Sequence, residues 1–428
     1  MRFDLLHPAD QLVMMMNRIY YRGMTTTSGG NLSIKDADGS IWITPSGVDK
    51  GKLGRDDIMR VKPDGSFEGR HKPSSEYPFH LSVFKHRPDL GAVLHAHSPG
   101  LVACSIVRCL PEVLLTTHTF QVCGDVVYAP YALPGSALLG DKIAAQFIKG
   151  NSVVMLENHG VVIGAADIFQ AFMIFETLET AARLQINALK LGRLRPLSED
   201  MARRAAALNI AEYPEMDLGP ATSEEKGLRR DLVKFVHRSY EQGLFTSTQG
   251  TYSARLSDGG FLITPYGKDR MYLDVDDIVL VRGGRSERGK VASRATQLHE
   301  EIYRQHPDIT SVLAAQPPNL MAFAVTDTPF DPRTIPESYI LLRDIQKIAF
   351  AQNLLEREAV ARMLSPRTPA LICENDSVIV TGKSLLNAFD RLEVAEFSAK
   401  SIIEALGLGP IVHIGAADIK DIELSFGL

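Results

Sequence analysis

The residues best suited to chemistry in this sequence are three histidines. His95 and His97 lie in a short apolar stretch, and His159 follows in the segment Glu157–Gly160. Alternate residues of a strand project to the same face, so the imidazoles of His95 and His97 can reach one ion. A third imidazole from another strand end would complete a three-nitrogen metal site with one coordination position open for substrate. The alternative is a pair of histidines near a strand end that binds nothing.

A second copy of the same pattern helps to decide between these interpretations. The segment Ile43–Gly47 recurs 220 residues later as Ile263–Gly267, a spacing that indicates tandem duplication of a whole domain. The positions that match the three histidines hold Ala314, Gln316 and Asp376. Residues that serve one purpose together should be lost together, whereas residues that support the fold should persist. The joint loss therefore favours a metal site in the first copy.

Glu76 changes between the two copies in the same way. Its counterpart is Ala295, whereas His80, four residues further on, keeps its counterpart His299. A carboxylate beside a divalent ion can move a proton to or from a carbon whose anion the metal stabilises. We therefore predict that Glu76 is the catalytic acid/base and that His80 and His299 are structural. A solvated surface charge is the alternative for Glu76.

A polar, glycine-rich cluster of three segments contains candidate anion ligands: Thr26–Asn31, Thr44–Gly47 and Ser74–Ser75. Glycine lets backbone N–H groups approach an anion, and hydroxyl groups add further donors. In the second copy Gly250 and Gly267 persist, while several donor side chains change, so we interpret the turns as structural and the donors as functional. The candidate substrate-binding residues are Gly30, Asn31, Ser46, Gly47, Ser74 and Ser75.

The elements that must position these residues include both helices and strands. Apolar periodicity predicts helices over 8–22, 75–85 and 167–191, the second capped by Ser74 or Ser75. Short apolar runs predict strands at 31–33, 41–44, 92–95, 152–156 and 161–163. The pattern predicts a layered α/β domain with helices against a central sheet, present twice. We divide the chain into a catalytic domain at 1–205, a linker at 206–222, a domain without metal ligands at 223–410 and a tail at 411–428.

Composition excludes several other classes of protein. The 428 residues are 45% hydrophobic and 23% charged, which is typical of a soluble protein with more than one domain. A net charge of −5 argues against nucleic acid as a partner, and no long apolar run predicts a membrane span. Four cysteines without paired spacing predict buried thiols, and the first ten residues lack the apolar core of a secretory signal. We therefore expect a cytoplasmic protein.

Six short segments, taken in order and spacing, resemble the class II aldolase/adducin family. They are Gly-Gly-Asn at 29–31, Thr-Pro-Ser-Gly at 44–47, Pro-Ser-Ser-Glu at 73–76, Arg-Pro-Asp at 87–89, His-Ala-His at 95–97 and Asn-His-Gly at 158–160. The resemblance implies an α/β/α sandwich around a mostly antiparallel sheet, assembled as a tetramer with active sites at subunit interfaces. It also implies Zn2+, or another divalent transition metal, on His95, His97 and His159, with Glu76 as acid/base. The first three segments would line a phosphate pocket.

The resemblance further implies a reaction class. The expected enzyme is a zinc-dependent lyase that cleaves or forms a carbon–carbon bond of a small sugar phosphate or keto/hydroxy acid, through an enediolate that zinc stabilises. A decarboxylase or a dehydratase of the same family is an alternative. A noncatalytic scaffold of the adducin type is an alternative from a different class.

The first copy departs from the family's aldolases at one position. Those aldolases use a tyrosine from a neighbouring subunit, shortly after an Ile/Leu-Pro pair, and the segment Leu110–Leu114 has none. The matching segment of the second copy, Ile335–Tyr339, does end in a tyrosine. We hypothesise that Tyr339 is lent across an interface in a homo-oligomer, a pseudo-tetramer of two chains. A buried tyrosine that satisfies one hydrogen bond is the alternative.

Overall fold

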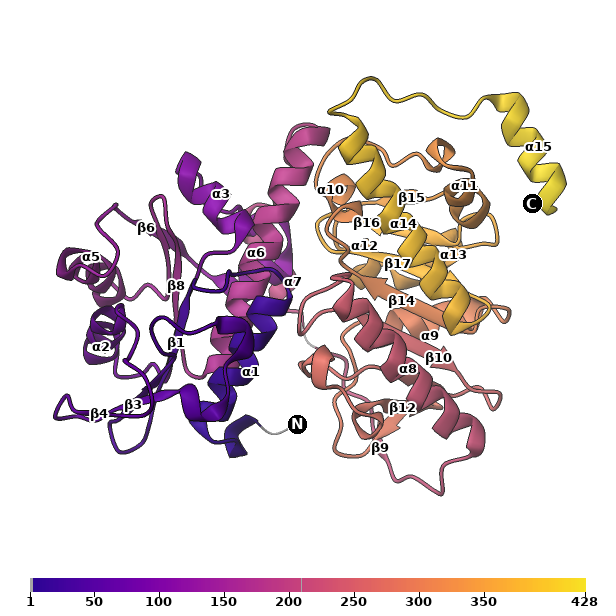
Figure 1. Ribbon diagram of the computed structural model, residues 1–428. Coiled ribbons are helices and arrows are strands. Elements are labelled where there is room, and N and C mark those ends of the chain that lie inside the picture. The colour runs from indigo at the N-terminus through magenta and orange to yellow at the C-terminus, as the bar shows by residue number, and fades with distance from the viewer. Residues whose placement is uncertain (1–2, 209) are drawn as a thin grey trace. The chain divides into compact units, whose positions relative to one another are not determined.

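A computed structural model describes residues 3–208 and 210–428 (Figure 1). The chain divides into two compact units, of which the first comprises residues 1–113 and 119–183 and the second residues 114–118 and 184–428. Each unit contains one sheet with helices on both of its faces. The predicted α/β sandwich and its duplication are therefore confirmed.

The first unit is built on an eight-stranded sheet with the order β4-β3-β2-β1-β5-β8-β7-β6. Neighbouring strands run antiparallel except β6 and β7, which are parallel. The strands are β1 Asn31–Lys35, β2 Ile41–Ile43, β3 Met59–Val61, β4 Phe67–Glu68, β5 Ala92–Ala96, β6 Val126–Ala129, β7 Val153–Leu156 and β8 Gly160–Ala165. Strand β5 is buried along its whole length between β1 and β8, which fixes the position of any residue at its end.

Helices cover both faces of this first sheet (Figure 1). On one face α2 and α5 bury Phe79 and Phe147 against strand residues such as Val93. On the other face α1 and α6 adjoin, and the Arg18 guanidinium lies 4.4 Å from the centre of the Phe172 ring. The helices are α1 Pro8–Tyr21, α2 Tyr77–His86, α3 Pro99–Val107, α4 Thr117–Cys123, α5 Ala137–Ile148 and α6 Ile168–Leu191, with short helices η1 Phe3–Leu5, η2 Lys50–Lys52, η3 Arg55–Asp57 and η4 Val113–Leu115.

The second unit repeats this arrangement on a nine-stranded sheet with the order β15-β16-β17-β14-β10-β11-β12-β13-β9. The pairs β15/β16 and β13/β9 are parallel and the others antiparallel. The strands are β9 Glu215–Met216, β10 Thr251–Arg255, β11 Phe261–Ile263, β12 Val279–Arg282, β13 Arg285–Glu287, β14 Ser311–Ala315, β15 Gln346–Ile348, β16 Ala370–Cys373 and β17 Ser377–Gly382. The mostly antiparallel sheet expected from the family resemblance is thus present twice.

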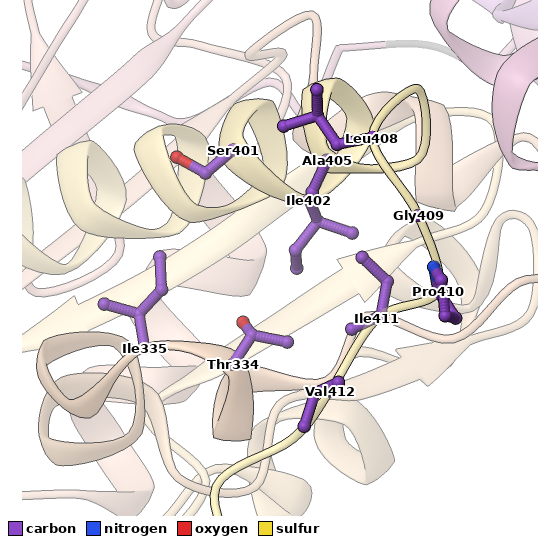
Figure 2. Close-up of a pocket in the computed structure, with 10 residues that line it drawn as sticks. All are labelled: Thr334, Ile335, Ser401, Ile402, Ala405, Leu408, Gly409, Pro410, Ile411 and Val412. Carbon is purple, nitrogen blue, oxygen red and sulfur yellow. The ribbon is translucent and has the colours of Figure 1, made fainter.

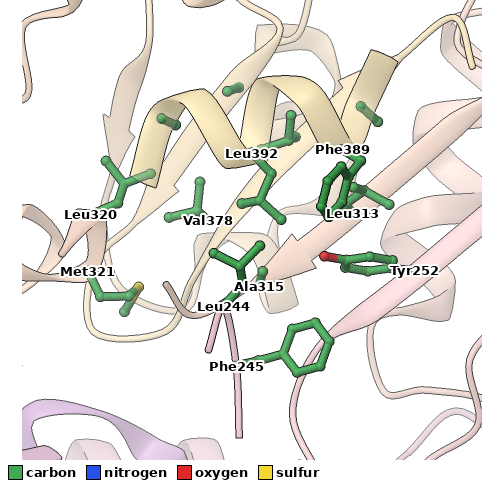
Figure 3. Close-up of a cluster of buried hydrophobic side chains, with 14 of the residues drawn as sticks. Leu244, Phe245, Tyr252, Leu313, Ala315, Leu320, Met321, Val378, Phe389 and Leu392 are labelled. Atoms are coloured by element: carbon green, nitrogen blue, oxygen red, sulfur yellow. The ribbon is translucent and has the colours of Figure 1, made fainter. Parts of the chain in front are cut away.

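Helices α9 and α13 cover one face of the second sheet, and α8 and α14 cover the other. On the latter face Phe389 and Leu392 of α14 pack over Tyr252, Leu313 and Val378 (Figure 3). The helices are α7 Glu199–Ala206, α8 Ser223–Glu241, α9 Thr296–Gln305, α10 Leu320–Ala324, α11 Pro336–Leu342, α12 Gln352–Leu355, α13 Arg357–Met363, α14 Leu385–Ala405 and α15 Ala416–Phe426, with short helices η5 Arg270–Tyr272, η6 Val275–Asp277 and η7 Pro332–Thr334.

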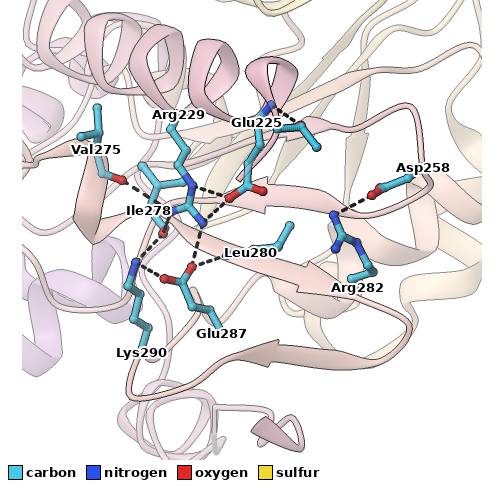
Figure 4. Close-up of polar contacts among 10 residues, drawn as sticks. Glu225, Arg229, Asp258, Val275, Ile278, Leu280, Arg282, Glu287 and Lys290 are labelled. Atoms are coloured by element: carbon cyan, nitrogen blue, oxygen red, sulfur yellow. Dashed lines mark hydrogen bonds and ion pairs between the residues drawn. The ribbon is translucent and has the colours of Figure 1, made fainter. Parts of the chain in front are cut away.

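The second unit also contains a buried arginine whose charge is compensated within the protein (Figure 4). Arg229 of α8 lies 2.9 Å from a carboxylate oxygen of Glu225 and 2.9 Å from one of Glu287. Its remaining donors reach the carbonyl groups of Val275 and Ile278. A buried cation is tolerated where charge and hydrogen bonds are both satisfied, as they are here.

Two sequence predictions about local structure are wrong. The helix predicted at 75–85 begins at Tyr77, and Glu76 rather than Ser74 or Ser75 occupies the N-cap position. The reason is a separate turn, in which the Tyr77 N–H donates to the Ser74 carbonyl at 3.0 Å. Cys109 is exposed rather than buried, because it follows the left-handed residue Arg108 that ends α3. Within residues 3–208 and 210–428 no helix has the length and apolar character needed to cross a bilayer.

Candidate active site

The strand pairing of the first unit brings the three histidines to one end of the sheet. His95, in β5, is paired with Asn31 of β1 on one side and with Val162 of β8 on the other. His97 follows directly after β5, and His159 directly precedes β8. Segments that are far apart in the sequence therefore meet where these three strands begin or end.

The imidazole nitrogens converge. The possible ligand atoms of His95, His97 and His159 lie within 4.8 Å of one another, and the Nε2 atoms of His95 and His97 are 2.8 Å apart. The Nδ1–H of His95 donates to the Val161 carbonyl at 2.9 Å, which leaves the Nε2 lone pair directed at the cluster. Burial lowers the pKa of His95 and of His97 to about 3 and also lowers the pKa of His159. All three rings are therefore neutral at pH 7 and offer lone pairs.

Two glycines make this convergence possible. Gly30 has a φ of +72°, and a Cβ atom there would lie 2.8 Å from the His95 carbonyl oxygen. At Gly160 a Cβ atom would lie 2.8 Å from Cδ2 of His97 and 2.5 Å from the Ala96 carbonyl oxygen. Real Cβ atoms do not approach other atoms so closely, so a side chain at either position would push the strand ends apart.

Glu76 faces the histidines. One of its carboxylate oxygens lies 3.4 Å from Nε2 of His95, and the other lies 3.9 Å from Nε2 of His159. The Nδ2 group of Asn31 donates to the first of these oxygens at 2.7 Å. The carboxylate is thus held beside the nitrogen cluster, where it can exchange a proton with a substrate bound there.

His80 orients Asn31, and through it Glu76. Nε2 of His80 lies 2.5 Å from Oδ1 of Asn31, and Nδ1 lies 2.7 Å from the Ser33 hydroxyl. Because an amide oxygen only accepts, Nε2 carries the proton and Nδ1 accepts from Ser33. Burial lowers the pKa of His80 well below its ordinary value, so this neutral form persists. No sequence pattern predicts this link, because His80 and Asn31 are 49 residues apart in the chain.

The donor set fits a divalent transition metal. Three neutral imidazoles are typical of zinc sites that keep a position open for substrate. Across the described parts of the chain, no second group of three or more histidine, cysteine or acidic side chains lies close enough together to hold an ion. At the matching place in the second unit, Asp376 instead accepts hydrogen bonds from Asn353 at 2.8 Å and Ser377 at 2.7 Å.

The predicted anion-binding segments lie side by side. The Ser46 N–H donates to the Lys72 carbonyl at 3.0 Å, and the Ser74 N–H donates to the Thr44 carbonyl at 3.3 Å. The exposed members are Ser46, Gly47 and Ser75, whereas Gly30, Asn31 and Ser74 are buried. The exposed members are therefore accessible to a ligand, whereas the buried side chain of Asn31 is held between Glu76 and His80.

Tyr339 lies in the second unit, in α11, and is only 5% exposed. Its hydroxyl donates to a carboxylate oxygen of Glu423 in α15 at 2.7 Å, and this hydrogen bond raises the pKa of Tyr339. The tyrosine therefore has a structural partner within its own unit. Its role as a proton donor across an interface stays a prediction.

The second unit also contains an apolar pocket of about 410 Å3 between the end of α14 and the segment that follows it (Figure 2). It is lined by Thr334, Ile335, Ser401, Ile402, Ala405, Leu408, Gly409, Pro410, Ile411 and Val412. None of these side chains is charged. The pocket therefore does not suit the anionic substrate expected for the histidine site.

Comparison with known proteins identifies the family. The family model "Class II Aldolase and Adducin N-terminal domain" matches residues 10–186 and again residues 230–403. The chain is 32% identical over 180 residues to the 3-oxo-tetronate 4-phosphate decarboxylase of Haemophilus influenzae, a match that covers 41% of this chain and 85% of that protein. It is 32% identical over 177 residues to the L-fuculose phosphate aldolase of Methanocaldococcus jannaschii, covering 41% and 94%. A solved L-fuculose 1-phosphate aldolase matches at 29% identity and a TM-score of 0.43, covering 48% of this chain and 96% of that one. The chain therefore belongs to the class II aldolase and adducin family, whose domain it contains twice.

Proposed function

We propose that the first unit is a metal-dependent lyase of the class II aldolase type, which cleaves or forms a carbon–carbon bond of a small sugar phosphate or keto/hydroxy acid. The observation that carries the proposal is the convergence of three neutral imidazoles with one carboxylate, 3.4 Å from the nearest of them. The matching residues of the second unit are all different, so that unit is proposed to be noncatalytic.

Each residue of the site has a separate task in this proposal. His95, His97 and His159 would hold a divalent metal, with zinc the first candidate, and the metal would supply Lewis-acid polarisation of substrate oxygens. Glu76 removes a proton from the substrate or returns one to it, since its carboxylate lies beside the cluster. Asn31 holds one carboxylate oxygen so that the other is free to face the substrate.

The substrate is proposed to end in a phosphate or carboxylate group. Ser46, Gly47 and Ser75 are exposed on adjacent turns and offer backbone and hydroxyl donors. Both relatives named above act on phosphorylated substrates according to their names. One name describes a decarboxylase and the other an aldolase, so the two names agree on a phosphorylated substrate but not on the reaction.

Decarboxylation of a phosphorylated oxo acid is a second candidate. The segment Leu110–Leu114 lacks the tyrosine that protonates the aldehyde in the family's aldolases. Loss of carbon dioxide forms no aldehyde and so requires no such donor, and Glu76 can return a proton to the carbon that remains. Dehydration remains a third reaction to be screened.

The second half is proposed to form a domain at 223–410, joined to the catalytic domain at 1–205 by residues 206–222 and followed by a tail at 411–428.

We also propose that two chains associate as a pseudo-tetramer and that Tyr339 serves a neighbouring site, which requires its hydroxyl to leave Glu423. Tyr339→Phe should then lower turnover without lowering metal content. Unchanged turnover would remove Tyr339 from the mechanism. A cytoplasmic location also stays a prediction.

The experiment that tests the function uses the full chain. Its metal content is measured after purification, and it is then assayed with short ketose phosphates and phosphorylated oxo acids, with identification of the products. An aldehyde product supports the aldolase and carbon dioxide supports the decarboxylase. A chain that neither retains a transition metal nor gains activity when one is added would instead be a scaffold.

A further inference from the structure

Lys50 is a buried cation beneath the predicted anion-binding turn of the first unit. It is 3% exposed and stands at the start of η2, shortly after the turn Pro45–Gly47. Its ammonium group donates to the Pro45 carbonyl, and its backbone N–H donates to the Thr27 carbonyl at 2.9 Å. Lys50 therefore ties together two of the three glycine-rich segments.

The charge of Lys50 has no counter-charge in the described residues. An ammonium group has three donors, and only the Pro45 carbonyl accepts from it among residues 3–208 and 210–428. No carboxylate of those residues forms an ion pair with it, and burial lowers its pKa to about 8. A buried cation without an anionic partner is costly, unlike Arg229 with its two glutamates.

The second unit resolves the same position differently. The counterpart of Lys50 is Arg270, also buried, at 2% exposure. Its guanidinium donates to the carbonyl groups of Gln249, Gly250, Lys268 and Pro265, at 2.8, 3.2, 3.0 and 3.0 Å. Asp269 and Asp277 also act to raise its pKa against the effect of burial. In the unit without metal ligands, the protein itself satisfies the cation.

From this contrast we infer that Lys50 is a binding residue for the oxyanion end of the substrate, which supplies the counter-charge that the protein lacks. The inference rests on the proposed function, and it assigns to the anion subsite a cation that the glycine-rich segments themselves do not contain. The ligand class is a small molecule with a terminal phosphate or carboxylate, bound at the exposed Ser46–Gly47 turn, which directly follows Pro45 in the chain.

The test measures binding of inorganic phosphate, and separately of acetate, to the full metal-loaded chain by calorimetry. Lys50→Met should weaken phosphate binding about 10-fold or more, since it removes a charged donor, whereas Lys50→Arg should keep it within about threefold. The matched control is Arg270→Lys in the second unit, which should leave phosphate binding unchanged. If Lys50→Met weakens the binding of acetate alone, the subsite takes a carboxylate. If it weakens the binding of phosphate, the subsite takes a phosphate.

Turnover provides the second readout. With the substrate found by the screen, Lys50→Met should raise KM about 10-fold with kcat within about threefold, because the lost interaction is made equally in ground and transition states. A purely structural lysine would instead lower stability and leave phosphate affinity intact. If Lys50→Met does not fold, Lys50→Gln takes its place, and rescue by Lys50→Arg still separates charge from packing.

The possible failures are distinguishable. A folded Lys50→Met chain that binds phosphate like the wild type, or a wild-type chain that binds neither anion, overturns the inference. Phosphate binding that depends on Lys50 in a chain that turns over no candidate substrate supports the inference and contradicts the proposed lyase function.

Discussion

The two copies of the domain keep the same serine–histidine pair and differ in what the histidine contacts next. In the first unit His80 forms hydrogen bonds with both Ser33 and Asn31, and Asn31 in turn donates to Glu76. In the second unit His299 lies 2.8 Å from the Ser253 hydroxyl, but its Nε2 atom has no hydrogen-bond partner among the described residues. The serine–histidine pair is therefore common to both units, whereas Asn31 and Glu76 occur only in the first, as the proposed catalytic role predicts.

The backbone of the site also persists where the chemistry is lost. Asn31 pairs with His95 in the first sheet, and Thr251 pairs with Ala314 at the same place in the second. Asn158 and Asn375 even share a left-handed backbone, with φ of 55° and 53°. The second sheet keeps this strand pairing without the three histidines, so we expect the first unit to keep its fold without a bound metal.

His95→Ala should abolish both metal binding and activity and leave the fold intact, since Ala314 occupies the matching position naturally. Elemental analysis and circular dichroism measure the two outcomes. Gln316→Ala, at the position that matches His97, is the control in the second unit, and its metal content should equal that of the wild type. Metal retained at full occupancy in His95→Ala would show that the ion lies elsewhere.

Glu76→Gln should retain the metal and lose turnover by about 10²-fold to 10⁴-fold, because an amide cannot accept the proton. The measurement is kcat at saturating substrate, with metal content as the control. Turnover within a few-fold of the wild type would mean that another group moves the proton.

Asn31→Thr, which copies the second unit, should lower kcat about 10-fold to 100-fold, because it removes a hydrogen bond to a charged carboxylate. The reciprocal change Thr251→Asn should have no effect on kcat, since Ala295 offers no carboxylate to hold. Equal kcat values for Asn31→Thr and the wild type would mean that the contacts of His80 and Asn31 do not contribute to catalysis.

The smallest expected effect concerns stability at alkaline pH. The pKa of Lys50 is lowered from 10.5 to about 8 in the folded chain, so between these values the unfolded chain binds more protons than the folded one. The free energy of unfolding of the wild type, relative to Lys50→Met, should therefore rise by about 1–3 kcal/mol as pH increases from 8 to 10.5. Phosphate should diminish the rise. Urea unfolding at several pH values measures this difference in free energy. A difference that does not change with pH would mean that burial does not lower the pKa of Lys50.

Much of this architecture is predictable from the periodic spacing of apolar residues and from the repetition of the domain sequence. The helices at 8–22 and 167–191 and the strand at 92–95 follow from apolar spacing, and they occur as α1, α6 and β5. The histidine cluster follows from the joint loss of its members in the second copy. Sequence spacing cannot give contacts that cross the sheet, which is why the link from His80 to Asn31 and the isolation of Lys50 emerge only in three dimensions. Cap positions such as Glu76 depend on a turn that no single residue type specifies.

The close fit at Gly160 has a consequence for any attempt to restore a metal site in the second copy. The ring of His97 occupies space that a Cβ atom at position 160 would claim, and the second copy has Ser377 there. Returning Gln316 alone to histidine would set an imidazole against that serine, and returning Ser377 alone to glycine would bring no benefit. Histidines alone are therefore not expected to rebuild the site in the second copy, because position 377 would also have to become glycine.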